Sequence, residues 1–136
     1  MMLKRYSSFP KLTPLISRNF ALQFEVAEKT KLPLFLHCRN AATDLLEILN
    51  RHRDSYTSGV VHSFDGTYEE AKSFLDLGLY IGLNGCSLKT DANLEVVQKL
   101  SIDRLLIETG KCECLFTASF IFEFNTFATL FRLSLV

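Results

Sequence analysis

Two histidines of this sequence stand where a short apolar run ends. His37 follows residues 34–36, and His62 follows residues 59–61. Runs of this kind predict buried parallel strands, and the carboxyl ends of such strands collect the functional groups of α/β proteins. Two imidazoles on neighbouring strand ends can converge on one metal ion, whereas the alternative is a pair of partly buried histidines bonded to the backbone. The spacing alone leaves both interpretations open.

Other charged residues are expected near the same strand ends. Arg39 lies two residues after His37, and Lys89 follows the third predicted strand, so both are candidate phosphate-binding residues, with plain surface solvation as the alternative. Glu108 ends the fourth predicted strand; it could ligate a metal or pair with a cation as structural support, and we favour the second role. His52 lies between two arginines at a predicted helix end, where a basic residue interacts favourably with the helix dipole, so no catalytic role is expected for it.

The elements that must position these side chains alternate between helix and strand. Apolar spacing and capping residues predict helices over residues 20–29 and about 42–53, and two more that begin at Thr67 and at Thr90 or Asp91. Short apolar runs predict four strands, at residues 34–36, 59–61, 79–83 and 104–108. Strands that alternate with helices pair in parallel through right-handed crossovers, so the expected fold class is α/β.

The composition excludes several classes of protein. The chain has 136 residues, of which 48% are hydrophobic and 22% are charged, as in ordinary globular domains. Fifteen basic residues balance fifteen acidic ones, so net charge gives no sign of a nucleic-acid partner, although a local cluster suffices to hold phosphate. The four cysteines are too few for a disulfide scaffold and lack zinc-site spacing, and we interpret them as reduced thiols of an intracellular protein.

The two ends of the chain depart from the strand–helix pattern. Residues 1–19 form a basic leader without an assigned element; we expect a cytoplasmic or nuclear location, with a mitochondrial one as the alternative suggested by this leader. Residues 111–136 form a tail that holds six of the twelve phenylalanines. Its residues 115–136 are long enough to span a bilayer, but the charges of Glu123 and Arg132 make a poor span, so no membrane partner is expected.

The sequence around the four predicted strands resembles the TatD family of metal-dependent deoxyribonucleases. Four motifs agree with that family in order, namely LPLFLHCRN at residues 32–40, VVHSFDG at 60–66, YIGLNG at 80–85 and LLIET at 105–109. The resemblance implies that residues 20–110 are the C-terminal half of a TIM-like (β/α)8 barrel. We therefore expect a partial barrel of about four parallel strands alternating with helices.

The resemblance also implies a chemistry. The family hydrolyses phosphodiester bonds of DNA with a pair of divalent metal ions, Mg²⁺, Mn²⁺ or Zn²⁺, and an activated water. Two of the family's metal-binding histidines correspond to His37 and His62. Its H-x-H pair and its glutamate, on the first and fourth barrel strands, have no counterpart in this sequence, and the final aspartate of its E-T-D motif is replaced by Gly110 after Glu108 and Thr109.

This incomplete set of metal ligands leads to the functional expectation. The chain is interpreted as a truncated TatD-like hydrolase that is inactive or weakly active alone, with any metal binding limited to its two histidines. The alternative is a non-catalytic fragment that pairs with a homologous chain or binds nucleic acid.

Overall fold

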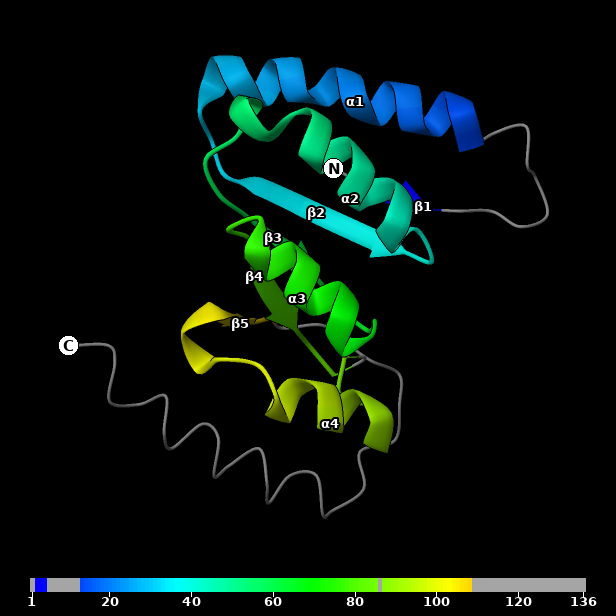
Figure 1. The fold of residues 1–136 in the computed structure, drawn as a ribbon, viewed down its shortest axis with the longest axis vertical. Coiled ribbons are helices and arrows are strands. Elements are labelled where there is room, and N and C mark those ends of the chain that lie inside the picture. Colours follow the sequence, from blue (N-terminus) through cyan, green and yellow to red (C-terminus); the bar gives the residue numbers. More distant parts are fainter. Residues whose placement is uncertain (1, 5–12, 86, 109–136) are drawn as a thin grey trace.

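A five-stranded parallel sheet forms the centre of the protein. The computed structural model describes residues 2–4, 13–85 and 87–108. Its strands follow one another across the sheet in chain order, and each pairs in parallel with the next (Figure 1). They are β1 (Met2–Lys4), β2 (Leu34–Arg39), β3 (Gly59–His62), β4 (Tyr80–Leu83) and β5 (Leu105–Ile107).

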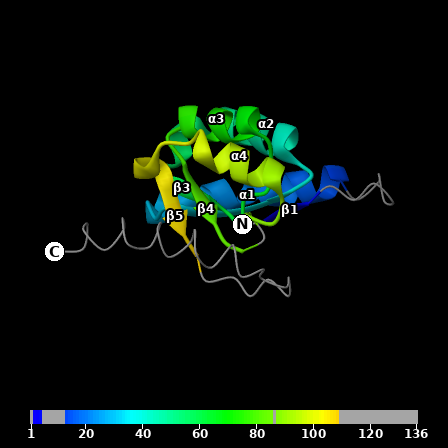
Figure 2. The same ribbon diagram turned by 90° about the horizontal axis from the view of Figure 1, so that it is seen from below.

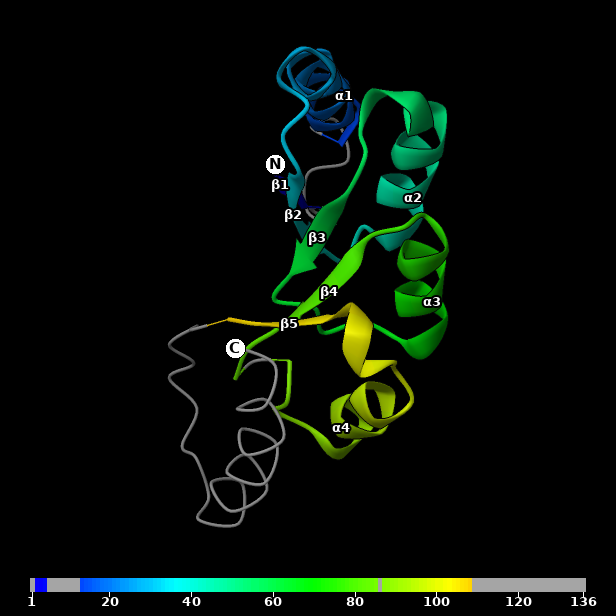
Figure 3. The ribbon, with the colours of Figure 1, turned by 90° about the vertical axis from the view of Figure 1, so that its left-hand side faces the viewer.

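Helices connect these strands and lie on one side of the sheet. They are α1 (Thr13–Thr30), α2 (Ala42–Arg51), α3 (Tyr68–Asp76) and α4 (Asp91–Gln98), with short 3-10 turns η1 (Arg53–Ser55) and η2 (Ile102–Arg104). Figures 2 and 3 show α2, α3 and α4 along one side of the sheet, while α1 lies beside α2 near β1. From β2 to β5 the chain alternates strand and helix, so the expected α/β fold is confirmed.

Local sequence signals place the ends of two helices. The predicted capping box of α3 is present: the Thr67 side chain accepts from the Glu70 backbone N–H at 3.2 Å, and the Glu70 carboxylate accepts from the Thr67 N–H at 2.9 Å. Thr90, rather than Asp91, caps α4 by accepting from a backbone N–H. Gly78 follows α3 with φ +76°, a left-handed conformation that glycine adopts without steric cost.

Two features of the sheet differ from the expectation. β1 and the first turns of α1 lie in residues 1–19, to which no element was assigned. β2 also runs on to Arg39, three residues beyond the predicted end, because β1 pairs with its last three residues and supplies their hydrogen-bond partners. The predicted tail, residues 111–136, lies outside the described residues.

The two faces of the sheet differ in what covers them. Side chains alternate along a strand, and those on the helix side, such as Leu36, Val61 and Ile81, are fully buried. On the opposite side no described helix covers the sheet, and Phe35 remains 57% exposed and Leu106 44% exposed. We call this side the open face; by alternation and strand register it includes Phe35, His37, Val60, His62, Tyr80, Gly82 and Leu106.

Candidate functional site

The two histidines at the strand ends lie in contact on the open face. His37 and His62 are register partners on β2 and β3. Nδ1 of His37 lies 2.8 Å from Nε2 of His62, and both side chains are partly buried. The structure thus brings together the two residues that the sequence singled out, and strand register is the cause.

His62 is held on its other sides as well. Its Nδ1 lies 3.2 Å from Oε2 of Glu108 and 3.1 Å from Oγ of Ser63. The ring stacks on Phe35 with a centroid distance of 4.6 Å and an interplanar angle of 25°. The second carboxylate oxygen of Glu108, Oε1, is buried and has no hydrogen-bond partner among the described residues. Glu108 therefore contacts His62 from the β5 side.

The contact with Ser63 depends on an unusual backbone conformation. Ser63 directly follows His62 and has φ +52°, so the chain turns back as the strand ends. Asn84, at the end of β4, donates from Nδ2 to Oγ of Ser63 at 2.5 Å. Sequence reasoning gave Ser63 no role, since a serine after a strand carries no distinctive signal by itself.

The two predicted phosphate-binding residues are exposed at the carboxyl ends of their strands. Arg39 ends β2 and forms an ion pair with Asp65, and more than half of its side chain remains exposed. Lys89 is exposed in the turn between β4 and α4. Nδ2 of Asn93, in the first turn of α4, donates to the backbone oxygen of Asp65 at 3.3 Å. Asp65 thus links the end of β2 to the start of the helix that follows Lys89.

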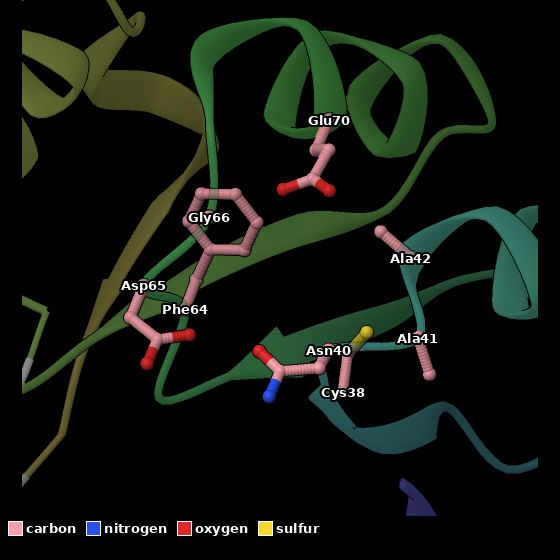
Figure 4. Close-up of a pocket in the computed structure, with 8 residues that line it drawn as sticks. All are labelled: Cys38, Asn40, Ala41, Ala42, Phe64, Asp65, Gly66 and Glu70. Atoms are coloured by element: carbon pink, nitrogen blue, oxygen red, sulfur yellow. The ribbon is translucent and has the colours of Figure 1, made fainter. Parts of the chain in front are cut away.

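A cavity of about 140 Å³ lies beside this ion pair, between the loops that follow β2 and β3. In Figure 4, Cys38 and Asn40 face Glu70 across it, with Asp65 at one side; the lining residues are Cys38, Asn40, Ala41, Ala42, Phe64, Asp65, Gly66 and Glu70. Burial raises the pKa of the Cys38 thiol to about 11. A thiol with that pKa is uncharged at neutral pH, so Cys38 is a poor nucleophile or metal ligand.

The third histidine has a different environment. The ring of His52 stacks on Phe24 of α1 with a centroid distance of 4.8 Å and an interplanar angle of 13°. It lies at the C-terminal end of α2, where its backbone N–H donates to Ile48. These contacts fit the structural role expected for His52.

The histidine pair is the candidate for holding one metal ion, because imidazole nitrogens are common metal ligands. Ligand nitrogens about 2.0–2.1 Å from a tetrahedral ion are about 3.4 Å apart, and the nitrogens of His37 and His62 stand at 2.8 Å. Both nitrogens could bind one ion only after the proton between them has left and the rings have moved slightly apart. His62 lies between His37 and Glu108, so one ion cannot contact all three directly, and no group of three such ligands occurs in the described part of the chain. Glu108 contacts Nδ1 of His62 at 3.2 Å, and its predicted supporting role stays a prediction.

Comparisons with known proteins identify the family. The model for TatD related DNase matches residues 10–111. A deoxyribonuclease Tat-D of Schizosaccharomyces pombe is 46% identical over 96 residues, which are 70% of this chain and 31% of that protein. An uncharacterized metal-dependent hydrolase of Buchnera aphidicola is 40% identical over 92 residues, 66% of this chain and 35% of that protein.

A solved structure supports the same assignment. The crystal structure of a TatD homolog from Escherichia coli superposes with a TM-score of 0.72 at 30% identity, covering 80% of this chain and 42% of that one. The chain therefore belongs to the TatD related DNase family, and its fold is part of the (β/α) barrel expected from the sequence. It spans about a third of the length of the curated relatives it matches, 31% and 35% for the two above. None of the helices in the described ranges is long and apolar enough to cross a bilayer.

Proposed function

We propose that this chain forms one side of a metal-dependent phosphodiesterase site that acts on DNA. The observation that carries the proposal is the contact of His37 with His62 at 2.8 Å on adjacent strand ends. The family model, a relative named as a deoxyribonuclease and another named as a metal-dependent hydrolase support this reaction and this substrate class.

Two residues of the proposed site bind the metal ion, and two others bind phosphate. His37 and His62 would hold a divalent ion, Mg²⁺, Mn²⁺ or Zn²⁺, and imidazole ligands suit zinc better than the other two. Such an ion polarises a phosphoryl oxygen and lowers the pKa of a water molecule. Arg39 and Lys89 bind the DNA phosphates. Arg39 can leave Asp65 for a phosphate at small cost, because an exposed ion pair contributes only about 0–1 kcal/mol.

On its own, the 136-residue chain is proposed to cleave DNA weakly or not at all. His37 and His62 are two ligands, and a catalytic site of this kind usually has at least three from protein. Gly110 stands where the family's final aspartate is expected, and a second copy of this chain would supply the same histidines again without that carboxylate. Association with a homologous chain through the open face stays a prediction, motivated by the exposure of Phe35 and Leu106.

Zinc binding tests the histidine pair. We expect calorimetric titration of the 136-residue chain to show zinc binding that weakens at least tenfold in His37→Ala and in His62→Ala. His52→Ala is the matched control, because His52 stacks on Phe24 and lies outside the site. Equal zinc affinity in all three variants and the wild type would remove the support for a metal site at His37 and His62.

A further inference from the structure

We infer that Gly82 and Glu108 form a positioning pair for His62: the bare Cα of Gly82 admits the Glu108 carboxylate, which fixes the ring proton of His62 on Nδ1. The consequence for metal binding rests on the proposed function. The geometry of the pair does not, since it concerns only residues of this chain in contact with one another.

Gly82 is required for space. It lies on β4, and a Cβ built there would overlap with Oε1 of Glu108, while standing 2.9 Å from Cδ of Glu108 and 3.0 Å from Cα of His62. Among the described glycines only Gly78 has positive φ, so Gly82 does not serve an unusual backbone conformation. Any larger side chain at this position would push the carboxylate away from its place beside His62.

The Glu108 carboxylate selects one tautomer of the neutral His62 imidazole. Oε2 of Glu108 lies 3.2 Å from Nδ1 of His62, with 20% and 24% of the two side chains exposed. An ionised carboxylate accepts hydrogen bonds and donates none, so this contact is favourable only when Nδ1 carries the proton. A bare Nδ1 lone pair facing the carboxylate oxygen would be repelled. Neutral His62 therefore keeps its lone pair on Nε2.

Ser63 cannot make this selection. Its hydroxyl lies 3.1 Å from the same Nδ1 and receives a hydrogen bond from Asn84. A hydroxyl can both donate and accept, so it tolerates either form of the imidazole. Glu108 can only accept, so it determines which ring nitrogen of His62 carries the proton.

The selected form directs His62 toward His37. The Nε2 lone pair of His62 accepts from Nδ1–H of His37 at 2.8 Å, and it is the same lone pair that His62 would offer to an ion. His37 would bind that ion through Nδ1 only in the form that carries its proton on Nε2. Histidine ligands commonly donate their second ring N–H to a carboxylate, and loss of that partner weakens metal affinity by about 10- to 100-fold. Gly82 and Glu108 thus prepare His62 before any ion arrives.

The test is the ¹⁵N NMR spectrum of the histidine ring nitrogens in the metal-free 136-residue chain. Wild-type His62 is expected to show a protonated Nδ1 and an unprotonated Nε2. Glu108→Gln keeps the size of the side chain, but its amide can donate or accept, so the two forms should mix. Gly82→Ala should produce the same mixing by displacing the carboxylate. Zinc affinity of Glu108→Gln, measured by calorimetry, should fall by about 10- to 100-fold.

Gly59→Ala is the matched control. A Cβ there would stand 2.7 Å from Leu34, so it strains β2 against β3 at the end away from His62. It should lower stability and leave the His62 proton on Nδ1. An unchanged His62 spectrum in Glu108→Gln would overturn the inference, and so would equal mixing in Gly59→Ala and Gly82→Ala. If Gly82→Ala does not fold, Glu108→Gln decides. Mixing in Glu108→Gln when even the wild type binds no zinc would support the positioning pair while contradicting the proposed metal site.

Discussion

Replacement of Phe35 by alanine measures how much of the open face is covered by other groups. Phe35 is 57% exposed, so less than half of its surface is covered, and the His62 ring supplies its stacked contact. Complete burial of such a side chain is worth about 1.5–3 kcal/mol, so the covered part contributes about 1 kcal/mol. A stacked aromatic pair adds about 0.5–1.5 kcal/mol. We therefore expect Phe35→Ala to lower the free energy of unfolding by about 1.5–2.5 kcal/mol.

Phe74 provides the comparison within the same chain. It is fully buried on the helix side of the sheet, and its replacement by alanine should cost about 3–5 kcal/mol. Urea unfolding followed by far-UV circular dichroism measures both variants, because the chain contains no tryptophan for fluorescence. If Phe35→Ala costs as much as Phe74→Ala, another surface covers the open face and the reasoning is wrong. A midpoint that rises with protein concentration would then identify a second copy as that surface.

Three further predictions concern the Thr67 cap, the buried Tyr56 hydroxyl and the two residues proposed to bind phosphate. Thr67→Ala should lower the free energy of unfolding in urea by about 1 kcal/mol. An unchanged unfolding midpoint would show that the Thr67 cap does not stabilise α3. The Tyr56 hydroxyl is buried without a hydrogen-bond partner in the described ranges, so Tyr56→Phe should be at least as stable as the wild type at neutral pH. Burial also raises the pKa of Tyr56, so the unfolded chain loses the hydroxyl proton at a lower pH than the folded chain. As pH rises above about 10, the stability of the wild type should therefore fall more steeply than that of Tyr56→Phe. Parallel urea titrations at increasing pH measure this difference. Arg39→Ala and Lys89→Ala should each reduce the slope of log affinity for single-stranded DNA against log salt by about 0.7, and an unchanged slope would exclude a phosphate contact.

The sequence predicts those features that depend on neighbouring residues. The apolar runs before His37 and His62 give the strand ends, and the spacing of Thr67 and Glu70 gives the start of α3. Strand pairing in chain order then brings the two histidines together, since both end adjacent parallel strands. These signals are local or follow from the strand–helix order, so these features can be predicted from the sequence.

Other features depend on register and could not be predicted. Gly82 lies on β4, and Glu108 directly follows β5. Their contact can be foreseen only when the register between β4 and β5 is known. β1 has three residues and no periodic pattern, yet its pairing extends β2 to Arg39. The stacking of His52 on Phe24 likewise joins two helices whose relative position no local motif encodes.

We predict that the two histidines of this chain do not by themselves form a working nuclease site. A fluorescent DNA cleavage assay tests it, with the 136-residue chain in excess Mg²⁺, Mn²⁺ or Zn²⁺ beside a variant carrying both His37→Ala and His62→Ala. We expect the wild type to cleave DNA little or no faster than the double variant with any of the three ions. Robust wild-type turnover that disappears in the double variant would show that His37 and His62 suffice, and the claim would be wrong.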